Sequence, residues 1–438
     1  MEKNDKKPFI FYGWWLVLVC VLIQGVGYGT SLYLYSVLIG AIGEEFKSGR
    51  FLLMVGVSGM LLLTGLMSPK IGSLLDRFPV KRILAAGALV MGIGFILMSF
   101  APHISLIIVC YAFFIALGMT ILSPLSCSVL LTRWFSRYRG LALGISALGT
   151  QLGGAVFPPI IAHSISLYDW RVTAAGLGVF IIVFIPLLAW FFVYDHPATK
   201  GLEIDGNRKH DSTADPSEVP KAPRTTIPKR LVSLKNIFTS RNFIIVVIFM
   251  GFLSIVYSGL LANLSLVAID KGQSLERGAF LVSLLALVGM VSSPLLGRVS
   301  DLLSVGATLA TLCLIATVSL FLYLRAESFA MLVAATVFFG FFGGGVVPVW
   351  SAVISRLYDS RIYGRVFGAS TALVYSMAAF SAPAIGLLYD LTTSYQITFL
   401  ILLIASLAVV LCAFGVKPQA REGIDEVIDQ QGEGRTSI

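Results

Sequence analysis

The strongest constraint on the fold is a nine-residue phrase that occurs twice, at residues 68–76 and 293–301. Both copies read Ser-Pro-x-x-Gly-x-x-x-Asp, so Gly72 and Asp76 correspond to Gly297 and Asp301. Each copy lies where a long apolar run gives way to a short polar turn. The chain therefore consists of two similar halves, and each half places an acid at the end of a helix.

The composition excludes an ordinary soluble domain. Hydrophobic residues make up 57% of the chain, charged residues only 13%, and the mean hydropathy is +0.89, whereas soluble domains carry roughly 25% charged residues. A helix needs about 20 apolar residues to cross a bilayer. We predict an all-α membrane protein with twelve transmembrane helices in two pseudo-symmetric six-helix bundles, near residues 12–38, 50–71, 83–101, 104–131, 141–165, 172–194, 242–268, 279–297, 305–324, 328–355, 366–388 and 396–416.

The polar segments divide this pattern into four regions. Residues 1–194 form the predicted N-terminal six-helix bundle, and residues 242–416 form the C-terminal one. The stretch 195–241 is polar and rich in proline, as expected of a cytoplasmic linker. Residues 417–438 form a polar cytoplasmic tail. The same 225-residue shift that relates the two phrases also carries Pro158 onto Pro383, which favours a parallel repeat about an axis normal to the membrane.

The distribution of basic residues predicts the orientation in the cell membrane. If the N-terminus is cytoplasmic, the outer turns contain only six of the 32 Lys and Arg: Lys47, Arg50, Arg171, Lys271, Arg277 and Arg325. This asymmetry follows the positive-inside rule and puts both termini in the cytoplasm. It also accounts for the net charge of +9 without a nucleic-acid partner.

Nothing in the sequence suggests an enzyme. The five cysteines lie in apolar spans without C-x-x-C spacing, so neither a disulfide framework nor a metal site is predicted. The glycine runs are not followed by the Lys-Ser/Thr of a phosphate-binding loop. We therefore expect no catalytic residue, metal or cofactor, and a monomer in contact with membrane lipid.

The repeated acids predict a gate. An Asp at the carboxyl end of a helix opposes the dipole of that helix, so Asp76 and Asp301 need a partner. We predict that the partner is the N-terminal end of a helix in the opposite half, span eleven for Asp76 and span five for Asp301. Arginines of the cytoplasmic turns would complete the contact, although they also simply obey the topology rule. The predicted gating residues are Gly72, Asp76, Arg77, Gly297, Asp301, Arg137, Arg139, Arg361 and Arg365.

The turn after span two resembles the G-x-x-x-D-R signature of the major facilitator superfamily, which is followed by basic residues. Gly72, Asp76 and Arg77 match it, with Lys81 and Arg82 beyond. The second copy has Leu302 in place of the basic residue, which puts the strength of its contact in doubt. The resemblance covers nearly the whole membrane region.

Two further segments are similar to signatures of the monocarboxylate and oxalate/formate transporter branch of that superfamily. One is Tyr12-Gly13-Trp14-Trp15 at the start of span one. The other is residues 134–144, Trp-Phe-Ser-Arg-Tyr-Arg-Gly-Leu-Ala-Leu-Gly, before and into span five. The resemblance implies a small organic anion as substrate, often moved with a proton or exchanged for another anion.

The chain departs from that branch at one important position. Carboxylate carriers of the branch commonly have an Arg in span eight just before a proline, but here Ser293 precedes Pro294. No acid, Lys or Arg lies near the middle of any predicted span. An anion at that depth needs opposing charge or aligned dipoles. An unwound stretch at residues 343–345, Gly-Gly-Gly, before Pro348 would supply free amides; alternatively, these glycines allow close helix packing.

Polar side chains at mid-depth are the candidate ligands of a substrate. Gly149 and Gly153 form a G-x-x-x-G helix contact, and Gln151 lies on roughly the opposite face, so we expect it to face the cavity. Tyrosine and tryptophan also occur at interfaces for purely structural reasons. The predicted substrate-binding residues are Gln24, Tyr28, Gln151, Tyr257, Asn263, Trp350 and Tyr375.

We predict a secondary active transporter that moves a small, monocarboxylate-like organic anion by alternating access, with a proton as a candidate co-substrate. The alternative is a carrier or efflux pump for a neutral or amphipathic solute, which the missing mid-span cation favours. Uniport also stays open, because no buried carboxylate is available to carry a proton. A non-transporting membrane sensor is a remote alternative.

Overall fold

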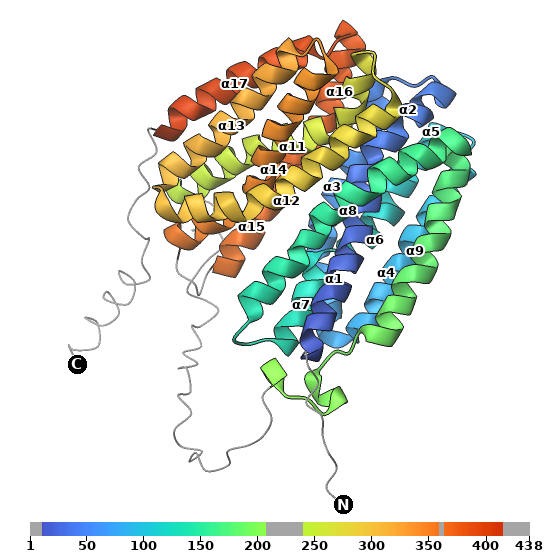
Figure 1. Ribbon diagram of the computed structural model, residues 1–438, viewed down its shortest axis with the longest axis vertical. Coiled ribbons are helices and arrows are strands. Elements are labelled where there is room, and N and C mark those ends of the chain that lie inside the picture. Colours follow the sequence, from blue (N-terminus) through green and yellow to red (C-terminus); the bar gives the residue numbers. More distant parts are fainter. Residues whose placement is uncertain (1–10, 207–239, 359–362, 415–438) are drawn as a thin grey trace, which may run out of the picture. The chain divides into compact units, whose positions relative to one another are not determined.

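The computed structural model describes residues 11–206, 240–358 and 363–414, and within these ranges the regular elements are helices (Figure 1). Eleven helical segments there are long and apolar enough to cross a membrane, and a twelfth, Gln396–Cys412, is apolar but shorter. The predicted all-α membrane fold is confirmed. The cytoplasmic tail and Arg361 lie outside the described residues, as do the side chains of Asp76, Arg139, Asp301 and Arg365.

The first six spans contain two π-helical segments. Each of the other elements is α-helical, and the order is α1 (Tyr12–Tyr28), η1 (Gly29–Tyr33), α2 (Leu34–Phe46), α3 (Arg50–Arg77), α4 (Val80–Ser99), α5 (Ile104–Val109), η2 (Cys110–Ile115), α6 (Ala116–Ile121), α7 (Pro124–Trp134), α8 (Arg139–Leu167) and α9 (Trp170–Phe192). Span one comprises α1 to α2, and span four comprises α5 to α7. Helix α1 packs on α8, and α4 packs on α9.

The second six spans repeat these pairings. They are α11 (Arg241–Asp270), α12 (Leu275–Leu302), α13 (Val305–Arg325), α14 (Phe329–Leu357), α15 (Tyr363–Ala379) with α16 (Ser381–Thr392), and α17 (Gln396–Phe414). Helix α11 packs on α15 and α13 packs on α17, as α1 packs on α8 and α4 on α9 in the first half. Helix α12 packs on α14.

The chain divides into two compact units. The first unit comprises residues 1–48 and 55–231, and the second comprises residues 49–54 and 232–438. The first turn of α3 thus belongs to the second unit, although the helix continues without interruption into the first.

The beginning of the predicted linker has ordered structure. Residues Pro197–Lys200 and Ile204–Gly206 form two short 3-10 helices, η3 and η4. The Asp195 carboxylate accepts a hydrogen bond of 3.1 Å from the Val80 backbone N–H at the start of α4. The Asp205 carboxylate accepts one of 2.8 Å from the Arg137 backbone N–H. Acidic groups at helix starts are favoured by the unpaired amides there, so these contacts attach residues 195–206 to the first unit.

Close packing of α1 on α8 depends on the absence of side chains. A Cβ on Gly149 would collide with the backbone of Val21, and a Cβ on Gly153 would collide with the backbone of Gly25. The predicted contact of the G-x-x-x-G motif is therefore present. Such approach brings backbones into van der Waals contact, which is the main attraction between helices in lipid.

The hypothesis of an unwound stretch in span ten is wrong. Helix α14 is continuous from Phe329 to Leu357 and includes the three glycines and Pro348. A Cβ on Gly344 would collide with Ser292 and the backbone of Gly289 in α12. The glycines thus allow α14 to approach α12 closely, and their amides belong to the helix.

A break does occur in span four. Leu122 and Ser123 separate α6 from α7, and Pro124 is the first residue of α7. Proline lacks an N–H and tolerates the first position of a helix. The Ser123 hydroxyl accepts a hydrogen bond of 3.1 Å from the Leu125 backbone N–H and caps the new helix.

We predict that Gly153→Ala destabilises the protein. The added methyl must displace the backbone of α1, and overpacking of this kind costs about 1–3 kcal/mol. The apparent melting temperature of the detergent-purified protein should fall. Gly144→Ala is the matched control in the same helix, because a Cβ there meets no atom within 4 Å. Equal melting of the two variants would contradict the packing described here.

Candidate transport site

Gln151 contacts a tyrosine that the sequence analysis did not single out. The Tyr33 hydroxyl donates a hydrogen bond to Gln151 Oε1, and the Tyr33 ring lies against Gly154, 2.7 Å from the position a Cβ would take. The side chain of Gln151 is half-buried. Because Tyr33 occupies the amide oxygen, Gln151 Nε2 is the group left to donate to a ligand. The π-helical segment that contains Tyr33 would have been difficult to predict from the sequence.

Gln24 is fully buried in α1, and within the described residues neither Nε2 nor Oε1 has a hydrogen-bond partner. The face of α1 around it packs on the region of the span-four break. Cys127 Sγ donates to the Cys20 carbonyl oxygen at 3.8 Å, and a Cβ on Gly27 would lie 2.8 Å from the Leu122 carbonyl oxygen. An unpaired buried amide costs about 1–3 kcal/mol. Gln24 is therefore the polar group of this unit with the most to gain from a ligand.

The predicted residues of α11 have structural partners. Asn263 Nδ2 donates to the Gly259 carbonyl oxygen at 2.9 Å, and Oδ1 accepts from the Tyr395 hydroxyl at 3.2 Å. Burial raises the pKa of Tyr395, which keeps this phenol protonated as the donor. The ring of Tyr257 lies against Gly343 and its centroid is 5.8 Å from that of Phe339.

The other predicted residues lie on three different helices. Trp350 is buried on α14, with its ring centroid 5.2 Å from that of Phe367, and its Nε1 has no partner among the described residues. Tyr375 is half-buried on α15, and Tyr28 is half-buried at the end of α1. Trp350 Nε1–H is thus a buried donor in the second unit that could donate a hydrogen bond to a ligand oxygen.

Little packs against the described residues of the predicted gate. A Cβ on Gly72 would meet no atom within 4 Å, and one on Gly297 would lie 3.6 Å from Pro348 Cβ. Arg77 is exposed at the end of α3. The Arg137 guanidinium carbon is 5.4 Å from the centroid of the Tyr138 ring. The roles of Asp76, Asp301, Arg139, Arg361 and Arg365 stay predictions.

Two arginines cap helices of their own unit. Arg133 Nη2 donates to the Leu75 carbonyl oxygen at 2.9 Å, and Arg356 Nη1 donates to the Leu303 carbonyl oxygen at 2.6 Å. Each arginine lies at the end of the fourth span of its half and meets the end of the second span. Cations are favoured there because the last carbonyls of a helix lack partners.

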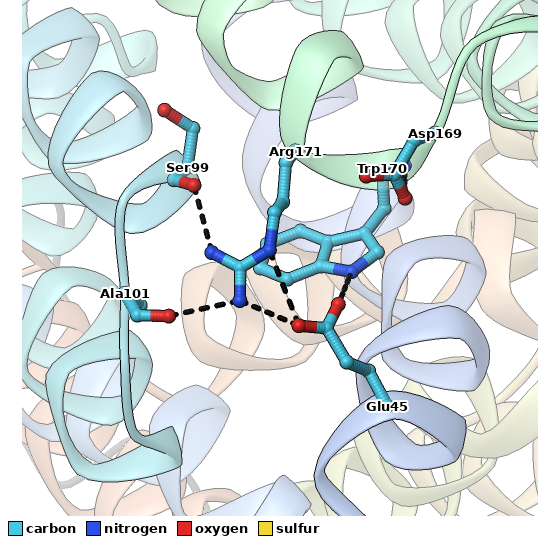
Figure 2. Close-up of polar contacts among 6 residues, drawn as sticks. All are labelled: Glu45, Ser99, Ala101, Asp169, Trp170 and Arg171. Carbon is cyan, nitrogen blue, oxygen red and sulfur yellow. Dashed lines mark hydrogen bonds and ion pairs between the residues drawn. The ribbon is translucent and has the colours of Figure 1, made fainter.

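A polar cluster at the other end of the first unit joins α2, α4 and α9 (Figure 2). Arg171 Nη2 forms an ion pair of 2.6 Å with Glu45 Oε1, and the guanidinium also donates to the carbonyl oxygens of Ser99 and Ala101, at 2.9 Å each. Trp170 Nε1 donates to the second oxygen of Glu45 at 2.5 Å. One guanidinium thus satisfies a carboxylate and the end of α4 together.

The two segments that resemble branch signatures meet in the structure. The ring centroids of Trp14 and Phe135 are 5.1 Å apart, and those of Tyr12 and Trp134 are 5.6 Å apart. Trp134 Nε1 donates to the Tyr194 carbonyl oxygen at 2.7 Å. The signatures thus form one aromatic cluster that joins the start of α1 to the end of α7 and to the segment after α9.

These features define a multi-pass integral membrane protein made of two repeated helical units. A family profile described as Major Facilitator Superfamily matches residues 21–327 and 291–435. The chain belongs to the major facilitator superfamily and is a secondary transporter, not an enzyme.

Its relatives are distant. The transporter called "Uncharacterized MFS-type transporter YcxA" of Bacillus subtilis (strain 168) is 24% identical over 422 residues, which are 93% of this chain and 97% of the relative. Monocarboxylate transporter 2 of Rattus norvegicus is 25% identical over 409 residues, 89% of this chain and 80% of the relative. Monocarboxylate transporter 13 of Bos taurus is 25% identical over 423 residues, with 92% and 88% covered.

Solved structures confirm the fold. The crystal structure of a bacterial homolog to the human lysosomal transporter Spinster, in an inward-facing and occupied conformation, superposes with a TM-score of 0.72. The sequence identity is 14%, and the match covers 96% of this chain and 100% of the other. At this identity the likeness shows the fold alone.

We predict that Arg171→Lys destabilises the first unit. A lysine ammonium can meet Glu45 but cannot span the two α4 carbonyls as a planar guanidinium does, so about 1–3 kcal/mol is lost. Thermal unfolding in detergent should show a lower apparent melting temperature. Arg277→Lys, at an exposed arginine whose guanidinium bonds to Gln273, should leave that temperature unchanged; similar losses in both variants would refute the role of the cluster.

Proposed function

We propose that this transporter carries a small organic anion of the monocarboxylate class. The observation that supports this most strongly is the aromatic cluster of the two branch signatures, in which Trp14 packs on Phe135 and Tyr12 on Trp134. Segments 120 residues apart thus act together as one structural element. Relatives named monocarboxylate transporters align over most of the chain.

The donors of the first unit are suited to an anion that is not met by a cation. Gln151 offers Nε2 because its oxygen is occupied by Tyr33, and Gln24 offers an unpaired buried amide. Neutral donors in a dry environment hydrogen-bond strongly to a carboxylate. In the second unit, the unpaired Trp350 Nε1–H is a donor of the same kind. Tyr28, Tyr257, Asn263 and Tyr375 complete the proposed substrate-binding residues.

The second candidate function is transport of a neutral or amphipathic solute. It is favoured by the span-eight position where the branch carries Arg, because here that position is Ser293. The neighbouring Ser292 side chain is also neutral, and its hydroxyl donates to the Gly289 carbonyl oxygen at 3.2 Å. A neutral solute would need no compensating cation.

The proposal includes the cellular setting. Both termini lie in the cytoplasm, as the distribution of Lys and Arg favours, and the membrane is that of the cell. The protein works as a monomer, with a proton as the candidate co-substrate. The inner gate consists of the Asp76 and Asp301 corners with Arg77, Arg137, Arg139, Arg361 and Arg365.

Flux in proteoliposomes tests the substrate class. We expect the purified protein to transport short-chain monocarboxylates but not the matching amides, which have nearly the same shape without the charge. A pH gradient that accelerates uptake would assign the proton as co-substrate, and an unchanged rate would assign uniport or exchange. Transport of the amides but not of the carboxylates would contradict the proposed anion and favour a neutral solute as the substrate.

The gate has its own test. We predict that Asp76→Ala changes the balance of inward- and outward-facing states more than substrate affinity, because the acid acts on a helix start and not on the solute. Accessibility of single introduced cysteines to impermeant thiol reagents from each side measures that balance. Asp301→Ala is the matched comparison and should have a smaller effect, since Leu302 replaces the basic neighbour. An unchanged balance in Asp76→Ala would remove the acid from the gate.

A further inference from the structure

The first turn of α3 is capped by an acid from the far end of the sequence. The backbone N–H groups of Arg50 and Phe51 donate to the Asp390 carboxylate at 2.8 and 2.9 Å, each to a different oxygen. Asp390 lies in the last turns of α16. The first amides of a helix have no partner within the helix, and the positive end of the dipole favours an anion there. Asp390 thus performs the role of an N-cap from another helix.

The Arg50 side chain is held by the neighbouring residues. Its guanidinium carbon lies 3.3 Å from the centroid of the Tyr389 ring and 4.9 Å from that of Tyr395. The Tyr389 hydroxyl donates at 2.7 Å to Asp270 Oδ1 at the end of α11. A guanidinium over the face of a tyrosine ring is attracted by the negative charge of the π-system. Backbone and side chain of Arg50 are therefore both bound by the same corner.

Two glycines allow this close approach. A Cβ on Gly386 would lie 2.7 Å from the Arg50 carbonyl oxygen, and a Cβ on Gly49 would lie 2.7 Å from Asp390 Oδ2. Residues 49–54 belong to the second unit, while the rest of α3 belongs to the first. One continuous helix thus has its two ends in different units.

We propose that Arg50, Tyr389 and Asp390, with Gly49 and Gly386, form a releasable clasp that gates the transport cycle at the end of α3 opposite Asp76. The predicted gate joins Asp76, at the carboxyl end of span two, to the start of span eleven. The clasp joins Asp390, near the carboxyl end of span eleven, to the start of span two. In both cases an acid at the carboxyl end of one span meets the start of the other span, with the two spans exchanged. Alternating access requires one of these contacts to open as the other closes.

The clasp occurs in one copy. Under the 225-residue shift, the counterpart of Asp390 is Ile165, which cannot accept a hydrogen bond. The contact is therefore not a general consequence of the repeat. The clasp does not depend on which solute is carried, so it stands or fails separately from the proposed substrate.

Asp390→Asn tests the clasp in the full chain reconstituted in lipid nanodiscs. Asparagine keeps the size but loses the charge and one acceptor oxygen. We expect hydrogen exchange of the amides of residues 50 and 51 to accelerate about 10-fold, because loss of a cap opens the first turn. Glu276→Gln, at the exposed start of α12, is the control and should leave their exchange unchanged. Unaltered exchange in Asp390→Asn would overturn the proposal.

A reciprocal change at the two ends of α3 separates a gate from a simple cap. Ser48→Cys reports on the clasp end and Ser73→Cys on the Asp76 end. In Asp390→Asn, we expect thiol labelling to rise about 3-fold at position 48 and to fall by a similar factor at position 73. Gly386→Ala, which forces Arg50 away without changing charge, should do the same, and Asp390→Glu should restore much of the original balance. Labelling that rises at both positions, or changes at neither, would reduce Asp390 to a structural cap.

Discussion

Everything in this structure depends on backbone groups being satisfied, and helices being joined, without help from water. Between helices in lipid there is little hydrophobic driving force, so close contact and hydrogen bonds hold the units together. The glycines of α8 lie against the backbone of α1, and those of α14 lie against α12. Where a helix is interrupted, at the span-four break, the Ser123 side chain caps the start of the next helix. The fold is thus assembled mainly by small residues, and the charged side chains named here lie near the ends of helices.

The ends of the helices show how that charge is used. Arg133 and Arg356 donate to terminal carbonyls, whereas Asp195, Asp205 and Asp390 accept from amides at helix starts or turns. Each cation meets a partial negative charge and each acid a partial positive one. The same pairing of acid and helix start underlies both the predicted gate and the proposed clasp. A transporter of this design can change state by exchanging one such contact for another of similar strength.

Much of the fold could be predicted from the sequence because apolar runs and polar turns alternate clearly. The ninth span, predicted at 305–324, is the helix Val305–Arg325, which begins after the capping Ser304. The first span was placed at 12–38, yet its helix continues to Phe46. There, Glu45 is neutralised by Arg171, a pairing across 126 positions that local composition does not reveal. The prediction of an unwound stretch in span ten was wrong for another reason. Glycines permit either a tight helix contact or an unwound stretch, so the sequence alone does not distinguish the two.

The candidate site was only partly predictable. Its polar residues could be named, since few occur at mid-depth, but their partners could not. Tyr33 reaches Gln151 from a π-helical segment, and Asp390 meets Arg50 across 340 positions. Pairing of this kind arises from the three-dimensional arrangement and leaves no periodic signal in the sequence. The unpaired donors of Gln24 and Trp350 became distinctive only in the structure, where Gln151 and Asn263 were seen to have hydrogen-bond partners.

The central claim is that neutral donors, and not a buried cation, recognise a carboxylate in this protein. Equilibrium binding to the purified protein, followed by tryptophan fluorescence, tests it most directly with a monocarboxylate, its amide and the variant Gln151→Leu. The account predicts that the carboxylate binds at least about 10-fold more tightly than the amide, a difference of about 1.4 kcal/mol, and that Gln151→Leu removes most of this preference. Equal affinity for the two ligands, or a preference that survives in Gln151→Leu, would contradict it.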